Sequence, residues 1–430
     1  MRGLWRLLAA HRDYRLLATA HLVSALGDYL LGVGLVYLVY DLTGSTLASA
    51  GMLVVSVLPQ ALLASPAGVL VDRWDRRRTL AACSLLQVAI LAPLLFVTDD
   101  SRIWLLYVVA GAQALVEQLS FPAEQALVPH LVPADDLVGA NAVNSQAANI
   151  ARLVGGSLGG VTAAWGGLPA LAVVDAVTFA AAAALVFAIR PQTAHAPVDP
   201  DAEPAPPEPW WTQWRAGLRV AMSSRTLKVL LVFEAGTAVG EGVMGTLFAP
   251  FVRDVLHGGA QGYGFVSGIQ AVGGVLGGLA VAAYASRIEP VRLLAMASVV
   301  FGVIDLAIFL YPLAYVSVWP ALVLMAVVGV PGAAVVASFT TLLQRGTTDA
   351  YRGRVFGTLL GLQSVGVLAG SLLAGWLGGL GGSRTIVAVI AWQGAGYVLL
   401  GLVVAATLGG RPAERPAGEA LIARPADVSP

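Results

Sequence analysis

Stretches of about 20 apolar residues recur along the whole chain and limit what it can fold into. A run of that length spans the hydrocarbon core of a bilayer as one α-helix. We therefore expect a polytopic membrane protein with an all-α fold. Twelve spans are predicted at residues 16–40, 47–71, 79–97, 103–126, 139–163, 168–189, 227–250, 261–285, 291–311, 318–343, 353–377 and 384–408.

The composition excludes other classes of protein. Hydrophobic residues make up 57% of the 430 residues and charged residues only 12%, against about 25% charged in soluble domains. Strands of a transmembrane barrel would be shorter and would alternate. The first span is too long for a cleaved signal peptide, and further spans follow it. The net charge of zero gives no field that would attract nucleic acid.

The placement of basic residues orients the chain. With a cytoplasmic N-terminus, 21 of the 25 Lys and Arg residues fall in inward-facing segments. The outward-facing loops hold only Arg102, Arg253 and Arg384, and Arg152 lies inside a span. This bias follows the positive-inside rule. We expect both termini in the cytoplasm of a bacterium, with the chain in its plasma (inner) membrane.

The chain divides into two halves joined by a linker. Residues 1–189 and 227–410 each hold six predicted spans. The segment 190–226 is rich in Pro and acidic residues, as flexible linkers are, and its end, from Trp210 to Arg219, is typical of a short helix at the membrane surface. The tail, 411–430, is expected to be disordered.

The two halves repeat each other weakly. Asp135, Gly139 and Gly156-Ser157-Leu158 recur 214 residues later as Asp349, Gly353 and Gly370-Ser371-Leu372. Gly27-Asp28 likewise corresponds to Gly240-Glu241, and Asp41 to Asp254, at an offset of 213. Repeated halves of this kind are found in transporters that bind substrate near the bilayer midplane. The sequence thus predicts two pseudo-symmetric six-helix bundles.

The loop between the second and third spans carries a motif. Residues 68–78 read GVLVDRWDRRR, in which Gly68, Leu70, Asp72, Arg73, Arg76 and Arg77 stand at ordered spacing. This resembles the loop signature of the major facilitator superfamily, with Asp75 in place of the usual second glycine. The resemblance implies a conformational latch whose partner is the cytoplasmic end of span eleven, at Asp349 and Arg352. A plain positive-inside loop is the alternative.

A second stretch narrows the resemblance to one branch. Residues 121–160 are similar to the macrolide-efflux and enterobactin-exporter branch of the superfamily, as are Ser24-x-x-Gly27-Asp28 and Leu42-Thr43-Gly44-Ser45. The resemblance implies a secondary transporter that exports small amphipathic compounds such as drugs, macrolides or siderophores. It also implies that spans one, four, seven and ten line the central cavity.

Three predicted spans carry polar stripes at helical spacing. They comprise His21, Ser24 and Asp28; Gln113, Glu117, Ser120 and Glu124; and Glu234, Thr237 and Glu241. An ionisable group at membrane depth is expensive and marks a functional candidate. A carboxylate there can exchange a proton for a cationic substrate. We expect Asp28, Glu117 and Glu241 to couple protons to transport, with Ser24, Gln113 and Thr237 beside them, whereas a purely structural role is the alternative.

Arg152 is the one cation inside a span, and it needs a partner. It can pair with Glu117, pair with Asp28, or bind an anionic group of the substrate. Asp175 and Asp305 lie in spans six and nine, which are peripheral helices by resemblance, and we expect them either to join neighbouring helices or to snorkel toward the membrane surface.

No cofactor or metal site is predicted. The single cysteine, Cys83, excludes an intrachain disulfide, and the phosphate loop GxxxxGK[ST] is absent, which argues against ATP-driven transport. We therefore expect the protein not to be an enzyme. Its expected partners are a small-molecule substrate, protons and the lipid bilayer around it, and it is expected to be monomeric. The alternatives are an uptake symporter, a lysophospholipid flippase, or a membrane sensor that transports nothing.

Overall fold

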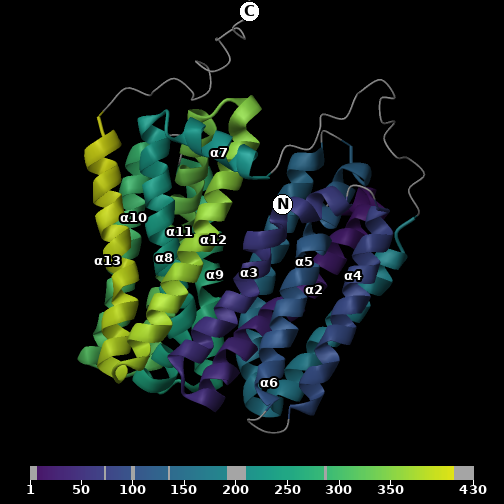
Figure 1. Cartoon of the computed structure of the whole chain (residues 1–430), viewed down its shortest axis with the longest axis horizontal. Coiled ribbons are helices and arrows are strands. Elements are labelled where there is room, and N and C mark those ends of the chain that lie inside the picture. The colour runs from purple at the N-terminus through teal and green to yellow at the C-terminus, as the bar shows by residue number, and fades with distance from the viewer. Residues whose placement is uncertain are drawn as a thin grey trace, which may run out of the picture. The chain divides into compact units, whose positions relative to one another are not determined.

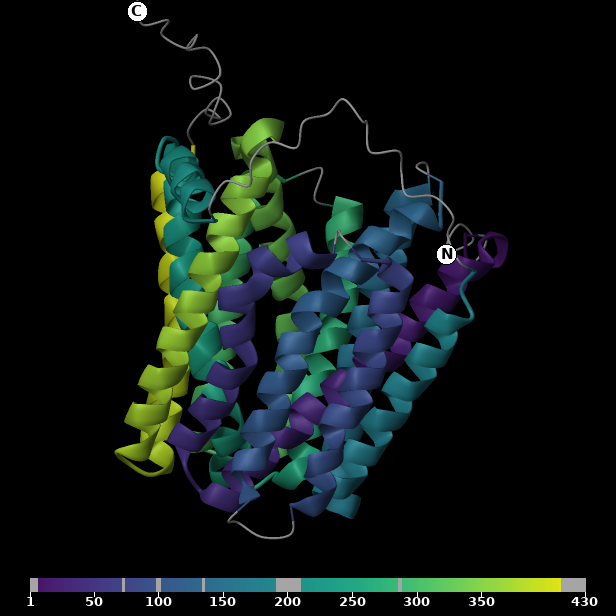
Figure 2. The same cartoon turned by 45° about the vertical axis from the view of Figure 1, so that its right-hand side comes forward.

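The fold is helical throughout the described part of the chain. The computed structural model describes residues 7–71, 74–97, 102–133, 136–190, 210–284 and 288–410, and it contains no strand within these ranges. Long helices run side by side within each part of the molecule (Figures 1 and 2). The chain forms two compact units, which are described in turn.

Unit 1 comprises Met1–Ala205 together with Ala249–Ala271. The segment Ala249–Ala271 comes after the linker in the sequence but packs with the first helices of the chain. It contains the end of one helix and the start of the next. Its elements are α2 (Arg12–Thr43), α3 (Thr46–Val71), α4 (Arg76–Leu91), η1 (Ala92–Phe96), α5 (Trp104–Leu127), η3 (Val128–His130), α6 (Leu137–Phe187), η5 (Phe251–Val255) and the first half of α9 (Gly259–Tyr284).

Unit 2 comprises Pro206–Phe248 and Val272–Pro430. It holds the second half of α9 and the elements α7 (Trp210–Ala221), α8 (Arg225–Pro250), α10 (Pro290–Leu310), η7 (Tyr311–Leu313), α11 (Val318–Gly346), α12 (Asp349–Gly379) and α13 (Ser383–Leu408). Of these helices, α10 and α13 pack along each other, and α11 packs on α10.

Ten helices in the described residues are long and apolar enough to cross a bilayer. The all-helical membrane fold predicted from the sequence is therefore confirmed, with a different segmentation. Two predicted spans, 139–163 and 168–189, merge into the 51 residues of α6, which folds at Gly167, where φ is 58° and ψ is −154°. The helix α8, which carries Glu234 and Glu241, is not among the ten.

In unit 1, small residues bring helix backbones into contact around α2. A Cβ atom on Gly155 would lie 2.5 Å from the carbonyl oxygen of Leu26. A Cβ atom on Gly159 would overlap the carbonyl oxygen of Leu30. These two glycines therefore hold the first half of α6 against α2. Glycine contacts of this kind take the place of hydrophobic burial as the source of helix packing in a membrane.

In unit 2, the helix α8 is held in the same way. A Cβ on Gly242 would lie 2.7 Å from the amide nitrogen of Ser371, and a Cβ on Gly370 would overlap the carbonyl oxygen of Val239. The hydroxyls of Thr246 and Ser371 add a buried hydrogen bond of 2.8 Å between α8 and α12. Gly27 and Gly240, which correspond in the sequence repeat, both face a neighbouring helix closely.

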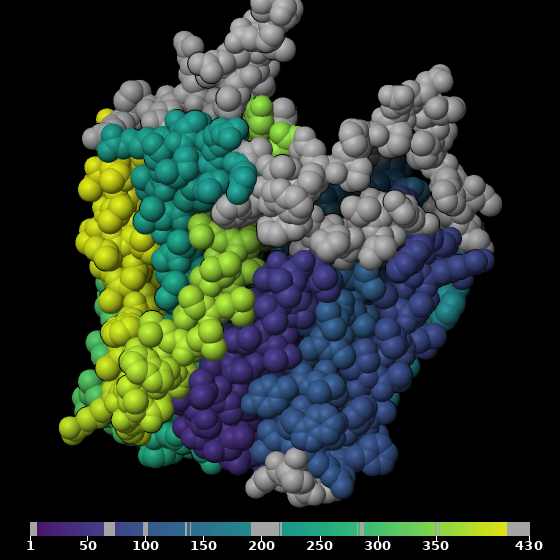
Figure 3. Space-filling view, in the orientation of Figure 1, coloured from purple at the N-terminus to yellow at the C-terminus, as the bar shows by residue number. Residues whose placement is uncertain are grey.

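The short helix predicted before the seventh span is present as α7. It packs on α12, where a Cβ on Gly217 would overlap the hydroxyl of Thr358 and the carbonyl oxygen of Arg354. The teal surface of α7 and the start of α8 lies against the yellow-green surface of α12 (Figure 3). Arg215 and Arg219 are exposed on α7. The remainder of the predicted linker, 191–209, and the tail, 411–430, lie outside the described residues.

The apolar interior of unit 1 forms two clusters. One surrounds Leu35, Leu94 and Leu106, and the other surrounds Tyr14 and Leu17. The hydroxyl of Tyr14 is buried and donates hydrogen bonds to the carbonyl oxygen of Ala140 at 2.9 Å and to the side chain of Asn144 at 3.1 Å. A polar atom in this apolar setting is thus paired, as its desolvation requires.

Candidate functional site

The polar stripes predicted on the first and fourth spans meet in unit 1. His21 of α2 lies 3.0 Å from Glu124 of α5, measured from Nδ1 to Oε1. Both side chains are largely buried, with 22% and 13% of their surfaces exposed. Ser24 lies one turn further along α2 and donates a hydrogen bond of 3.2 Å to the carbonyl oxygen of His21. The pair links α2 to α5. From the sequence, His21 and Glu124 could only be assigned to polar stripes on two separate helices.

Asp28 occupies the next turn of the same α2 face. Its side chain is exposed at the surface of α2, and the carboxylates of Glu117 and Asp175 are near enough to act on it electrostatically. Glu117 in turn accepts a hydrogen bond of 3.1 Å from the hydroxyl of Ser120. Three carboxylates thus share one region of unit 1, and together they favour binding of a proton or a cation.

Asp175 is fully buried against α2. It lies opposite Gly27, where a Cβ atom would overlap both its carboxylate and the hydroxyl of Thr178. Thr178 donates a hydrogen bond of 3.2 Å to one carboxylate oxygen, whereas the other is buried without a partner. Asp175 therefore lies against α2 but bonds within its own helix, and it places a third acid beside Asp28.

Two predicted site residues present unpartnered polar atoms. Both the oxygen and the nitrogen of the Gln113 side-chain amide are buried without a hydrogen-bond partner, as is Nε of Arg152. Within the described residues, Arg152 forms no ion pair with Glu117 or Asp28. Buried polar groups without partners are expensive, and both residues are therefore candidates for binding a ligand.

In unit 2, Glu241 and Thr237 lie on α8 as predicted. The side chain of Glu241 is exposed and accepts a hydrogen bond of 3.4 Å from the amide of Gln363 on α12. Thr237 is buried and donates back to the carbonyl oxygens of Phe233 and Glu234, at 3.0 and 3.2 Å. The hydroxyl of Thr237 is therefore used within its own helix, whereas the carboxylate of Glu241 remains open to a ligand.

Behind Glu241 lies a buried aromatic group. The ring of Tyr397 contacts Phe301 at a centroid distance of 4.4 Å and Phe233 at 6.3 Å. The carboxylates of Glu234, Glu241 and Asp305 all act electrostatically on its hydroxyl. Asp305 is 2% exposed, and one of its oxygens is buried without a partner. Unit 2 therefore holds a second group of acids, bordered by aromatic rings.

The described part of the loop motif is held within unit 1. The side chain of Asp75 accepts a hydrogen bond of 2.7 Å from the amide of Arg78 and caps the start of α4. Arg76 lies 2.8 Å from His130, and Arg77 donates to the carbonyl oxygens of Val186 and Phe187 at the end of α6. Asp72 and Arg73 lie outside the described residues, and the surroundings of Gly68, Asp349 and Arg352 are likewise not described.

Unit 1 also contains an ion-pair cluster where α2 ends. Arg253 of η5 lies 2.8 Å from Asp41 and 5.5 Å from the centre of the Tyr40 ring. The hydroxyl of Tyr40 donates a hydrogen bond to Asp254. Near this cluster, a Cβ on Gly264 would lie 2.7 Å from Cα of Gly160, so α9 and α6 touch through glycines.

Sequence reasoning missed the pairing of His21 with Glu124 and the cluster around Arg253. The signal was present, because His21 and Glu124 lie at similar depths of two predicted spans, and Asp41 and Arg253 lie just beyond the outward ends of the first and seventh spans. A sequence does not show which helices are neighbours, and so it could not join them. Within the described residues, no group of three His, Cys, Asp or Glu side chains is arranged to hold a metal ion, and Cys83 is buried.

The fold and the polar groups inside it define a multi-span membrane transporter. Within the described residues, ten helices are long and apolar enough to cross a bilayer, and several of them carry carboxylates, which are costly at membrane depth. The sequence pattern of the Major Facilitator Superfamily matches residues 17–357, and the chain belongs to that family. Its members are transporters, not enzymes.

Relatives extend this result. The Enterobactin exporter EntS of Citrobacter koseri is 25% identical, over 94% of this chain and 93% of its own length. The uncharacterised MFS-type transporter YfiS of Bacillus subtilis is 26% identical, but the match covers only 40% of each chain. A crystal structure of a bacterial homologue of the human lysosomal transporter Spinster, at 16% identity, has a TM-score of 0.67 and covers 94% of this chain and 98% of its own. It shares the fold.

Proposed function

We propose that the protein is a secondary active exporter of small amphipathic compounds, of the drug, macrolide or siderophore type, driven by proton antiport with alternating access. The observation that carries this proposal is the pair of acid groups, around Asp28 in unit 1 and around Glu241 in unit 2. These residues correspond in the sequence repeat and lie on equivalent helices. The match to an exporter over nearly the whole of both chains supports the direction of transport.

The proposed architecture has twelve spans in two six-helix bundles, 1–189 and 227–410. Counting the two sides of Gly167 separately, and adding α8, raises the ten candidate helices to that number. The linker 190–226 and the tail 411–430 would be cytoplasmic, with both termini, in a bacterial inner membrane. The protein would act as a monomer with no cofactor. The excess of basic residues in alternate loops supports this orientation.

In the proposed mechanism, a proton and a substrate compete for the same carboxylates. Asp28 is flanked by Glu117 and Asp175, so releasing its proton creates a negative charge beside two other acids. A cationic substrate relieves that repulsion, whereas a proton relieves it when the substrate has left. Glu241, which accepts a hydrogen bond from Gln363, would do the same in unit 2.

Polar neighbours would orient the substrate. Gln113 and the Nε of Arg152 have unpaired hydrogen-bonding atoms that a substrate group can satisfy. Ser24 and Thr237 lie beside the carboxylates. The loop residues Gly68, Asp72, Arg73, Arg76 and Arg77, with Asp349 and Arg352, would form the latch that distinguishes two conformations of the transporter.

Drug susceptibility in an efflux-deficient bacterial host tests the proposal. Wild type, Asp28→Asn and Glu241→Gln are compared at equal expression, with Glu289→Gln as a matched control because the Glu289 side chain is exposed and makes no capping hydrogen bond. We expect wild type and the control to protect against at least one compound, and the two carboxylate variants to lose that protection. Protection retained in both variants would reject these coupling residues.

Proteoliposomes then separate proton antiport from the alternatives. Adding the protective compound should dissipate an imposed pH gradient with wild type, but not with Asp28→Asn. Accumulation of the compound together with protons would instead identify an uptake symporter, and movement of a labelled lysophospholipid between leaflets a flippase. No flux of any of these would leave a membrane sensor as the remaining interpretation.

A further inference from the structure

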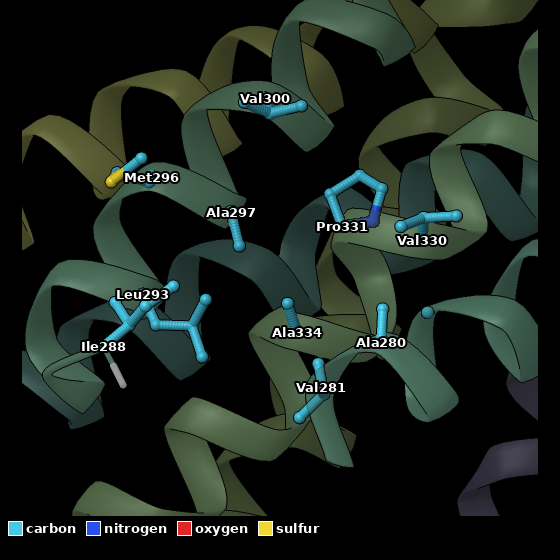
Figure 4. A pocket seen from close by; sticks show the side chains of 11 residues that line it. Ala280, Val281, Ile288, Leu293, Met296, Ala297, Val300, Val330, Pro331 and Ala334 are labelled. Carbon is cyan, nitrogen blue, oxygen red and sulfur yellow. The ribbon is translucent and has the colours of Figure 1, made fainter. Parts of the chain in front are cut away.

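An apolar groove in unit 2 has no role in the proposed transport cycle. It has a volume of about 330 Å³ and is lined only by apolar residues, from α9, α10 and α11 and from Ile288 just before α10. Ala280 and Val281 approach from α9, Leu293 and Ala297 from α10, and Ala334 from α11 (Figure 4). That volume lies within the usual range of small-molecule sites, about 300–1,000 Å³.

The floor of the groove is set by contact between two backbones. A Cβ on Gly277 would lie 2.6 Å from the carbonyl oxygen of Val330, so α9 and α11 touch there. Alanines line the groove above this contact, and their small side chains leave its space unfilled. Pro331 lies inside α11 at the same level. The groove is therefore a product of small residues on three helices and not of a missing side chain.

The groove opens toward the surface of spanning helices. Met296 and Val300 line it and are 58% and 49% exposed. Apolar side chains exposed on a membrane-spanning helix face hydrocarbon. The face of α10 that carries these side chains runs from residue 292 to residue 300, and this stripe is about 12 Å long at 1.5 Å per residue. This is close to the depth of one leaflet, since a whole hydrocarbon core is about 30 Å thick.

A positive charge lies at one end of this stripe. Arg292 is exposed, stands one turn before Met296 on the same face of α10, and makes no ion pair within the described residues. It lies in the first turn of α10, where free backbone amides also favour an anion. Glu289, at the N-cap, is exposed as well and is the acidic group closest in sequence. Arg292 lies one turn before the groove residue Met296 on α10, whereas Glu289 precedes the helix.

We propose that this groove binds one acyl chain of an anionic phospholipid, with the lipid phosphate held at Arg292. The apolar lining recognises the chain, and the charge at its end recognises the headgroup. Free phosphate has no acyl chain that could occupy the groove. A zwitterionic lipid of the same chain length lacks the net negative charge that Arg292 attracts. The carboxylates around Glu241 are not among the residues that line the groove.

Native mass spectrometry of the detergent-solubilised full chain tests the proposal with phosphatidylglycerol and phosphatidylcholine of identical chains. One basic residue near a membrane surface favours an anionic lipid by about fivefold. We expect wild type to retain phosphatidylglycerol over phosphatidylcholine by about that factor. Arg292→Gln should bring the ratio close to one. Arg345→Gln, an exposed arginine at the end of α11, is the matched charge control and should keep the wild-type ratio.

A second variant tests the groove itself. Ala297→Leu places a larger side chain in the groove and should reduce the retention of both lipids. Val303→Leu, on the exposed side of α10 but outside the groove, should leave retention unchanged. Equal retention of the two lipids by wild type, or equal losses in Arg292→Gln and Arg345→Gln, would overturn the proposal. A change of oligomeric state in Ala297→Leu would also overturn it, because the groove would then be an interface between copies.

Discussion

An alanine at position 273 would test whether direct backbone contact holds α9 against α11. Gly273 is buried, and a Cβ atom there would overlap the carbonyl oxygen of Ala326 and lie 3.0 Å from Cα of Gly329. The obstructing atoms belong to the backbone of α11. They cannot rotate away, so one helix must shift relative to the other.

The size of the effect follows from two opposing terms. Overpacking of a tight contact costs about 1–3 kcal/mol, whereas replacing glycine by alanine inside a helix stabilises it by about 1 kcal/mol. Gly278 provides the control, because it lies in the same helix and a Cβ there has no atom within 4 Å. The propensity term is common to both variants. Gly273→Ala should therefore be less stable than Gly278→Ala by about 1–3 kcal/mol.

The assay is reversible unfolding of both variants and wild type in mixed micelles, with the apparent melting temperature as an independent measure. We expect Gly278→Ala to match or exceed wild type and Gly273→Ala to fall below it. If Gly273→Ala proves as stable as Gly278→Ala, the helices are not in contact at this point. The interpretation that close glycine contacts hold the helices of unit 2 together would then be wrong.

Three further substitutions test single interactions, each by thermal unfolding of the purified protein. Asp75→Ala removes the cap of α4 and should cost about 1 kcal/mol, whereas Asp75→Gly should cost only a few tenths; equal losses would argue against capping. Arg253→Ala should cost about 1 kcal/mol in low salt, with a smaller loss in 1 M NaCl because salt screens exposed pairs. The exposed Arg384→Ala serves as its control, and a salt-independent loss would contradict this interpretation. His21→Gln weakens the partly buried partnership with Glu124 and should cost about 1–3 kcal/mol; an unchanged stability would show that the pair is incidental.

Much of the fold could be predicted because the bilayer imposes a length on each helix. The apolar runs predicted spans that the structure reproduces as α2 to α6 and α9 to α13. The merging of two spans into α6 could not be predicted, since Gly167 and its neighbours form a turn without polar residues. The cap formed by Asp75 was predictable in principle, because aspartate is a favoured N-cap residue.

The sequence could predict which residues of the candidate site share one face of a helix. It could not predict which residues on different helices contact each other. Helical spacing placed Ser24 with Asp28 and Thr237 with Glu241, and the structure keeps these faces. It adds Glu124 as the partner of His21, and Gln363 as the partner of Glu241. Such pairs depend on how helices rotate and pack against each other, which periodicity along one helix does not determine.

The turn at Gly167 has a consequence for how the protein is made. Its φ of 58° and ψ of −154° lie in a region that only glycine occupies readily. The two arms of α6 are joined without a polar loop, so no hydrophilic segment has to be carried across the membrane between them. The arms can therefore leave the translocon together as a helical hairpin. A residue with a Cβ atom at 167 would strain this turn, so we expect it to impair formation of the hairpin during synthesis.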